Sequence, residues 1–384
     1  MNAYLDHAAA AVSRPAVREA MAEALEVVGS PSSVHEWSRG PQEILDRARE
    51  QVASLLGAEP RQIIFTSGAS ESRNLAIKGL ASANRRLGDD LVISAVEHPA
   101  TVAAARTITR ESGSLTEVKV DGEGHIPARG VEEAIGGSTS VASFVLGQGD
   151  IGTLNDPTAL VAAAKAARGD VRVHIDAGDC VGRVPIDVAS VGCDAITLGG
   201  WPLGAPPWAG ALWLAEGARM HPLIEGGVQE LGKRSGSEAL PAIAALGAAA
   251  AAATAEGEQR HRRLAALSER LIAGIEGIDD VRLNGPRQTR VPGHVQVSVG
   301  TVEAETLVLG LSVRGVAASP GSACTAYAGK AAPALEAIGL EAPWTQSAVL
   351  FTMGDATTEA EIDFAITAFT EALAQFRAAS PLGR

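Results

Sequence analysis

The stretch Phe65-Thr-Ser-Gly-Ala-Ser-Glu-Ser72 runs from a short apolar segment through a glycine turn into the start of a helix. The residues before it predict a strand at 62–65, and the pattern after it predicts a helix at 71–87. Ser70 and Glu71 are typical caps of such a helix start, where exposed N–H groups attract an anion such as phosphate. Many α/β loops share this pattern, so by itself it indicates a strand–turn–helix unit.

The alternation of strands and helices continues on both sides of this unit. Short β-branched runs separated by amphipathic stretches predict a mostly parallel sheet with helices on both faces. Helical periodicity marks 16–27 and 42–56 upstream. Downstream, strands are predicted at 90–94, 114–120, 140–146, 171–175, 195–198 and 211–214, and helices at 100–110, 131–135 and 159–167.

After Gly236 the pattern changes to that of a smaller α+β domain. Residues 239–275 form an Ala- and Leu-rich helical region that is too long for one helix without a break. Predicted strands at 281–283 and 294–299 and helices at 304–311 and 359–376 follow. We therefore predict a large domain over 1–250 and a small domain over 251–384, with residues 1–15 packing on the small domain.

Composition narrows the classes of function. The chain has 384 residues and a formal net charge of −13, and such a surface repels the phosphate backbone of nucleic acids. No apolar run reaches the roughly 18 residues of a membrane span, and no signal peptide is evident at the start. The three cysteines lack CxxC spacing, which favours a reducing compartment and argues against a metal site. These features predict a soluble, cytoplasmic protein without nucleic-acid or membrane partners.

The segment His174-Ile-Asp-Ala-Gly-Asp-Cys180 lies at the end of a predicted strand. His174 and Asp176 therefore lie at the carboxyl end of this strand, and open α/β sheets bind ligands at the carboxyl ends of their strands. A carboxylate there could hold a protonated heteroaromatic nitrogen, but Asp176 is equally typical of a cap or a turn.

A turn-rich loop, Ala317-Ala-Ser-Pro-Gly-Ser-Ala-Cys324, presents one cysteine beside small residues. Thiols on exposed loops tend to be reactive, whereas most lone cysteines are small core residues. We expect Cys324 to be the reactive thiol, and Cys180 and Cys193 to be buried.

Six motifs occur in one register. They are Tyr4-Leu-Asp-His-Ala-Ala, the stretch from Phe65 extended to Ala76, Glu97-His98, His174-Ile-Asp-Ala, Arg234-Ser-Gly-Ser237 and Gly321-Ser-Ala-Cys-Thr325. Together they resemble the NifS/IscS-type cysteine desulfurases over nearly the whole chain. The resemblance implies the fold-type I of pyridoxal-phosphate (PLP) transferases and a homodimer.

The resemblance also implies roles for single residues. Ala69 and Ser70 would meet the cofactor phosphate, and Ser237 would reach it from the other subunit. His98 would stack on the pyridine ring and Asp176 would bind its nitrogen. Cys324 would be the nucleophile that forms a persulfide.

The chain departs from the resembled pattern at the chemical centre. Gly199-Gly-Trp-Pro202 stands where Ser-Gly-His-Lys is expected, so Pro202 replaces the lysine that forms the aldimine. Asp179 replaces a Gln, and Gly149, after Gln148, replaces an Asn near the cofactor hydroxyl. Leu350 replaces the Arg that binds the substrate carboxylate. No covalent cofactor is therefore expected, while non-covalent PLP remains open.

Three functions follow from this comparison. The first is a repurposed, PLP-independent enzyme or a sulfur-handling protein. Its site would use Cys324, His98, Asp176 and Asp179, in a pocket formed by Gln148, Trp201, Pro202, Trp208 and Arg234. The second is a non-catalytic partner of an active desulfurase, and a sulfur acceptor is a further candidate partner. The third, less favoured, is a PLP-dependent desulfurase or lyase with an unusual site, because only Lys233 and Lys330 could approach it.

Overall fold

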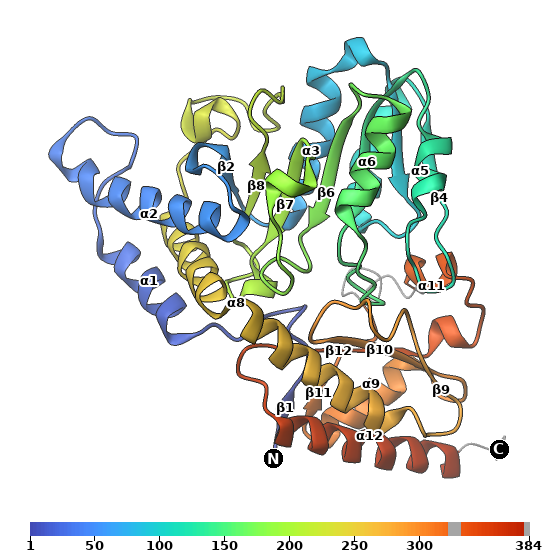
Figure 1. The fold of residues 1–384 in the computed structure, drawn as a ribbon. Coiled ribbons are helices and arrows are strands. Elements are labelled where there is room, and N and C mark those ends of the chain that lie inside the picture. The colour runs from blue at the N-terminus through green and yellow to red at the C-terminus, as the bar shows by residue number, and fades with distance from the viewer. Residues whose placement is uncertain (322–331, 380–384) are drawn as a thin grey trace.

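A seven-stranded sheet forms the centre of the computed structural model, which describes residues 1–321 and 332–379 (Figure 1). All neighbouring strands run parallel except β8, which is antiparallel to both β2 and β7. The predicted fold class is therefore confirmed. In spatial order the strands are β2 (Ile63–Thr66), β8 (Gly210–Leu214), β7 (Ala195–Gly199), β6 (Arg172–Ala177), β5 (Thr139–Val145), β3 (Asp90–Ser94) and β4 (Leu115–Val118).

The central strands of the sheet are buried on both faces, whereas the edge strand β4 exposes Thr116 and Glu117. Every residue of β5 is buried, as expected of a central strand in a helix-covered sheet. Successive side chains of β3 belong to different apolar clusters, Leu91 and Ile93 to one and Val92 to the other. The helices that precede or connect these strands are α1 (Pro15–Glu26), α2 (Arg39–Leu56), α3 (Ala69–Ala83), α4 (Pro99–Glu111), α5 (Ala128–Ala134), α6 (Pro157–Ala167) and α7 (Val188–Val191).

Helix α3 begins differently from the sequence expectation. Its N-cap is Gly68, and no side chain caps it, so the prediction of Ser70 as a cap is wrong. Glu71 does act at this end, because its carboxylate accepts a hydrogen bond from the Ser67 N–H at 2.8 Å. The helix ends at Ala83, and a separate 3-10 turn covers Arg85–Leu87.

The long helix α8 (Leu240–Ile275) connects the sheet to the C-terminal part of the chain. The predicted break occurs at Gly257, whose φ of 44° and ψ of −123° are accessible to glycine but not to ordinary helical residues. By length and composition α8 could cross a membrane. However, 56% of its most apolar window is buried inside the structure, as in the core helix of a soluble protein.

The C-terminal part is a three-stranded antiparallel sheet covered by helices. Its strand order is β12 (Ala348–Thr352), β10 (His294–Val299) and β9 (Val281–Leu283), and α9 (Ala304–Val313) and α12 (Glu359–Ala379) pack on it. The short helix α11 (Pro333–Ala337) packs instead into the apolar cluster of the large sheet. The N-terminal strand β1 (Ala3–Tyr4) pairs in parallel with β11 (Val316–Ala317). Ala3 and Leu5 join the apolar cluster of this part, which takes α8 residues from Leu264 onward. The domain boundary between residues 250 and 251 remains a prediction.

Candidate functional site

The candidate site lies where β5, β6 and β7 end and α4 begins. Asp176 is in β6, and Asp179 follows two residues after that strand. His98 is the N-cap of α4, and its Nδ1 accepts a hydrogen bond from the Ala100 N–H at 3.0 Å. The neutral imidazole therefore carries its proton on Nε2. Trp201 and Pro202 form the 3-10 turn η4 (Trp201–Leu203) directly after β7.

A buried arginine that the sequence analysis did not single out joins the two aspartates. Arg73, in the second turn of α3, donates from Nε to Asp176 Oδ2 at 2.6 Å and from Nη2 to Asp179 Oδ2 at 2.9 Å. The side chains of Arg73 and Asp176 are 2% and 0% exposed. The signal available in the sequence was a basic residue in the second turn of the helix after Gly68, together with one acidic residue at the end of a central strand, Asp176, and another just after it, Asp179.

Charge and burial act against each other within this cluster. Burial alone would lower the pKa of Arg73, but the charges of Asp176 and Asp179 raise it above its usual value. Burial would raise the pKa of Asp176, but Arg73 lowers it. For His98, burial and the charge of Arg73 both lower the pKa. Arg73 and Asp176 are thus charged, while the neighbouring imidazole is neutral. Replacing either Arg73 or Asp176 alone would lower the free energy of unfolding by about 3–5 kcal/mol, because the other charge would stay buried without a partner.

Trp201 extends the cluster toward the small domain. Its indole Nε1 donates to Asp179 Oδ1 at 3.1 Å, and the guanidinium carbon of Arg183 lies 4.7 Å from the centre of its ring. Arg183 is itself fixed by hydrogen bonds to the carbonyls of Pro292 and Met353 at 2.8 and 2.6 Å. The indole is therefore held from two sides.

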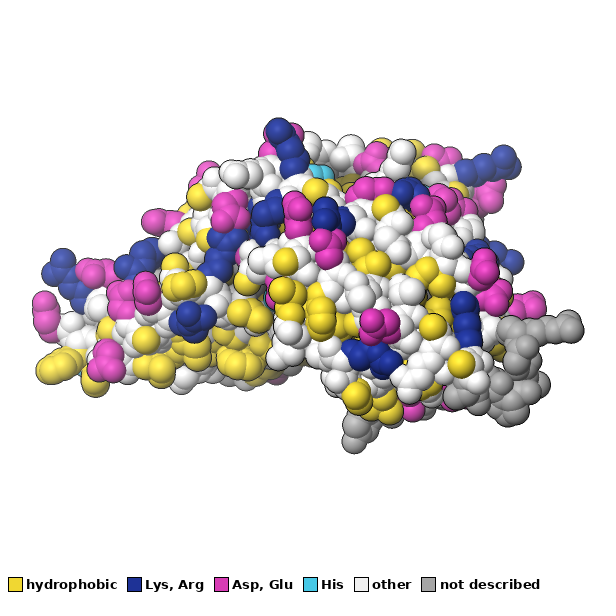
Figure 2. All heavy atoms as spheres, turned by 90° about the horizontal axis from the view of Figure 1, so that it is seen from below, with side chains coloured by type: hydrophobic (Ala, Val, Ile, Leu, Met, Phe, Trp, Pro, Cys, Tyr) yellow, Lys and Arg dark blue, Asp and Glu magenta, His cyan; other side chains and the backbone are white. Residues whose placement is uncertain are grey.

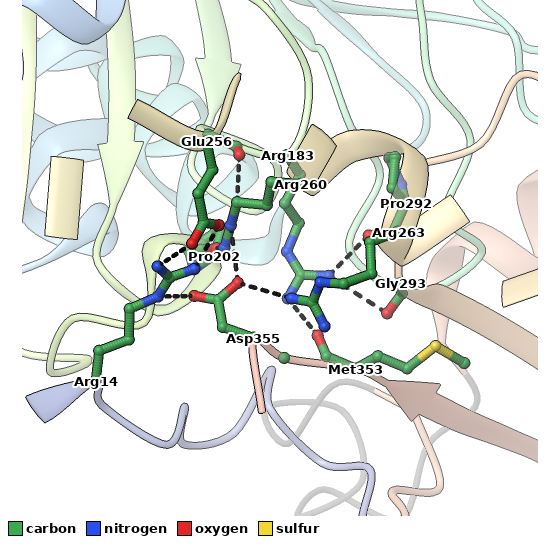
Figure 3. A network of polar contacts seen from close by, with 12 residues as sticks. Arg14, Arg183, Pro202, Glu256, Arg260, Arg263, Pro292, Gly293, Met353 and Asp355 are labelled. Atoms are coloured by element: carbon green, nitrogen blue, oxygen red, sulfur yellow. Dashed lines mark hydrogen bonds and ion pairs between the residues drawn. The ribbon is translucent and has the colours of Figure 1, made fainter. Parts of the chain in front are cut away.

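Pro202 is bound through its carbonyl to a network of arginines and acidic residues (Figure 3). Arg260 Nη2 donates to the Pro202 carbonyl at 2.6 Å, and its Nε donates to Asp355 at 2.8 Å. Arg14 also reaches Asp355 at 2.8 Å and binds Glu256. This network joins the N-terminal segment, α8 and the small domain to the turn after β7.

A small cavity of about 140 Å³ opens beside the cluster. This is below the roughly 300 Å³ at which ligand pockets usually begin. Its described lining contains three aspartates and no lysine or arginine. Burial raises the pKa of one of them, Asp6, to about 6. The lining includes Asp6, His98, Gln148, Asp179, Trp201 and Leu350.

The structure separates the residues that were expected to form one pocket. His98, Gln148, Asp179 and Trp201 share the small cavity, and Asp176 lies buried beside it. Trp208 is 57% exposed and, with Arg234, lines a second cavity of about 230 Å³. The single pocket expected from the sequence is thus divided between two cavities, and Pro202 lines neither of them.

The other predicted site residues lie at the start of α3 and beyond. Ala69 is half-buried and Ser70 exposed in the first turn of α3, while Ser237 is exposed. Arg234 pairs with Glu71 at 3.0 Å. Cys324 and Lys330 lie outside the described residues. Within 1–321 and 332–379, no group of three or more His, Cys, Asp or Glu side chains could hold a metal ion.

Glu97 is a second buried acid that the sequence reasoning did not assign. Its Oε1 accepts hydrogen bonds from Ser94 Oγ and the Val145 N–H, both at 2.6 Å, while Oε2 has no hydrogen-bond partner. Burial, with a further contribution from the charge of Asp176, raises the pKa of Glu97 to about 8. Glu97 is therefore protonated near neutral pH.

The two described thiols are buried. Burial raises the pKa of Cys180 well above its usual value and that of Cys193 to about 12. Because the thiolate is the reactive form of cysteine, neither residue is a nucleophile in the folded protein near neutral pH.

Comparison with known proteins finds one family along nearly the whole chain. The family model of aminotransferase class-V matches residues 3–364. A cysteine desulfurase IscS from Dictyoglomus turgidum is 34% identical over 98% of this chain and 96% of its own length. The corresponding values for cysteine desulfurase IscS 1 from Archaeoglobus fulgidus are 32%, 99% and 99%.

Solved structures show the same fold. A NifS-like protein superposes with a TM-score of 0.91 at 25% identity, covering 98% of this chain and 100% of that one. A structure described as SspA in complex with cysteine gives a TM-score of 0.79 at 27% identity, with 91% and 98% covered.

We predict that Glu97 makes the stability of the protein depend on pH. Its carboxyl ionises near pH 4.5 when unperturbed but near 8 in the fold, so the unfolded state releases its proton first as the pH rises. Glu97 therefore lowers the free energy of unfolding progressively between about pH 5 and pH 8. Glu97→Gln, which mimics the protonated side chain, should be more stable than the wild type at pH 8, by on the order of 4 kcal/mol.

Chemical denaturation at several pH values measures this difference. Glu132→Gln, which changes an exposed glutamate of α5, is the control and should follow the wild type. Parallel stability curves for the wild type and Glu97→Gln would show that Glu97 ionises in the fold as it does in the unfolded chain.

We predict that mild alkylation of the native protein at neutral pH labels neither Cys180 nor Cys193. Their rates should be at least about a hundredfold below that of an exposed thiol and should rise on unfolding, because burial suppresses the thiolate. Peptide mapping after iodoacetamide treatment measures this, with Cys324→Ala as the control that removes the expected reactive thiol. Labelling of Cys180 or Cys193 before Cys324 would refute the assignment.

Proposed function

We propose that this chain, which belongs to the aminotransferase class-V family and is similar along its length to cysteine desulfurases, does not perform lysine-dependent PLP chemistry. It acts instead as a PLP-independent enzyme or a sulfur-handling protein of the same fold. The observation that carries this proposal is Pro202, which occupies the position after β7 where the resemblance places the Schiff-base lysine. A proline side chain offers no amine, and the Arg260 hydrogen bond holds this turn in place.

The described lysines support the proposal because none lines the small cavity. Lys165 is bound to Asp194 at 2.9 Å, and Lys233 donates to the Met220 carbonyl at 2.8 Å. Lys78 lies in α3, and Lys119 follows the edge strand β4. Lys330 lies outside the described residues, and the Lys330→Ala variant tests whether it contributes an amine.

The charge of the cavity gives further support. An amino-acid substrate needs a cationic partner for its carboxylate, and none is present among the described lining residues. Leu350, where the resemblance places an arginine, presents an apolar side chain to the cavity. The lining favours a small neutral or cationic ligand over cysteine.

Sulfur handling, within this proposal, would use Cys324. A persulfide carrier needs a thiolate that can reach both a donor and an acceptor, and the burial of Cys180 and Cys193 disfavours them for that role.

A second candidate function is that of a non-catalytic partner subunit. The end of α1 and the arm that connects it to α2 expose large apolar side chains, visible at the left of Figure 2. These residues are Leu25, Val28, Val34 and Trp37, which are 66%, 70%, 104% and 69% exposed. A patch of this kind favours a protein contact, either with a second copy of this chain, with an active desulfurase or with a sulfur acceptor.

We predict that the purified protein is colourless and releases neither sulfide nor alanine from L-cysteine, even with added PLP. Without an amine at position 202 no Schiff base forms in the site, so borohydride should leave unchanged the spectrum of the protein purified without added PLP. An absorbance spectrum after dialysis, together with a sulfide assay run beside an active desulfurase, measures this. A yellow preparation bleached by borohydride, or sulfide release that Lys330→Ala abolishes, would refute the proposal.

We predict a homodimer that depends on the exposed arm. Light scattering at micromolar concentration should give about twice the 39.2 kDa mass of one chain. Val34→Asp should weaken the dimer at least about tenfold, because it places a charge in an apolar contact. Val313→Asp changes another largely exposed valine, in α9, and should leave the mass unchanged. A wild-type mass of 39.2 kDa would contradict the prediction.

A further inference from the structure

We infer that Arg73 takes the place of the cationic pyridine ring, so that the site is closed to PLP even without a covalent bond. This inference rests on the proposed function and extends it from the missing amine to the binding of the cofactor itself. This chain has both residues that the family resemblance assigns to the ring, His98 and Asp176. Their arrangement in this chain does not fit the ring.

The first reason is that Asp176 is already engaged. Its Oδ2 accepts from Arg73 Nε at 2.6 Å and its Oδ1 accepts from the Gly178 N–H at 2.9 Å. A pyridinium N–H would need the same carboxylate, which is 0% exposed. The ring nitrogen and the guanidinium are cations competing for one buried anion.

The second reason is space. A Cβ built on Gly178 would lie 2.5 Å from Arg73 Nη2, 2.9 Å from Asp176 Oδ1 and 3.0 Å from Arg73 Cζ. These distances are shorter than van der Waals contact, so the guanidinium fills the space beside the backbone directly after β6. Arg73 can therefore occupy this position only because residue 178 is a glycine and has no side chain.

The third reason is that Arg73 is held on its far side as well. Its Nη2 donates to Asp179 Oδ2, and the other oxygen of Asp179 accepts from Trp201. The guanidinium cannot swing away from Asp176 without also leaving Asp179 uncompensated. Asp176, Arg73, Asp179 and Trp201 form one continuous chain of hydrogen bonds.

Equilibrium dialysis with pyridoxamine 5′-phosphate tests the inference. This probe keeps the ring and phosphate of PLP but has no aldehyde, so it cannot form Schiff bases with surface lysines. The wild type should retain no more probe than serum albumin does. Arg73→Ala, which frees Asp176 and the space beside Gly178, should bind at least about tenfold more tightly than the wild type.

A matched control is Arg49→Ala, which removes another arginine–carboxylate pair, with Glu230 at 2.8 Å, and should not create binding. Binding of the probe by the wild type as tightly as by Arg73→Ala would overturn the inference, as would failure of a folded Arg73→Ala to bind it. Either result without sulfide release would leave the proposed function intact, whereas sulfide release from cysteine would refute that function.

Two further variants apply if Arg73→Ala does not fold. The double variant Arg73→Ala, Asp179→Asn removes one of the two carboxylates that Arg73 compensates, so that Asp176 alone stays negatively charged. It should show the same gain in binding of the probe. Gly178→Ala in the otherwise unchanged protein should lower the melting temperature by on the order of 3 °C, because the added methyl group meets the guanidinium. Gly137→Ala is the control and should leave the melting temperature unchanged, because a Cβ built there meets no atom within 4 Å. An unchanged melting temperature for Gly178→Ala would contradict the position of Arg73.

Discussion

The ion pair between Arg73 and Asp176 is the interaction on which the centre of this structure depends. Asp176 sits at the end of a central strand with no exposed surface, and a carboxylate in such a position must be neutralised or strongly hydrogen-bonded. Arg73 supplies the positive charge from the second turn of α3. The two groups meet only when three parts of the fold have formed. These are the sheet, the strand–turn–helix unit of β2 and α3, and the turn after β6.

Several other properties follow from this pair. The anionic Asp176 contributes to keeping Glu97 protonated, and the cationic Arg73 contributes to keeping His98 neutral. Asp179 completes the charge compensation of Arg73 and orients Trp201 through its indole N–H. The charged groups of the site therefore compensate one another through hydrogen bonds within the cluster, which favours a rigid arrangement. A cofactor site would leave such groups available for a ligand.

Much of the fold could be predicted from the sequence, and the reasons are local. Alternating β-branched runs and amphipathic stretches specify strands and helices by their own periodicity, and the break within α8 follows from a length that one straight helix rarely reaches. Asp176 was placed correctly at a strand end because that position depends only on the strand. The role of Arg73 was missed because it depends on distances between residues 103 positions apart in the chain. Trp201 and Trp208 looked equivalent in the sequence, yet only the fold shows that one is buried beside Asp179 and the other is largely exposed.

The most direct test of this account is a crystal structure of the protein grown with excess pyridoxal phosphate. We expect electron density for the Arg73 guanidinium within hydrogen-bonding distance of the carboxylates of Asp176 and Asp179, and no ring between His98 and β6. A pyridoxal ring whose nitrogen lies within hydrogen-bonding distance of Asp176, with the Arg73 side chain displaced, would contradict it.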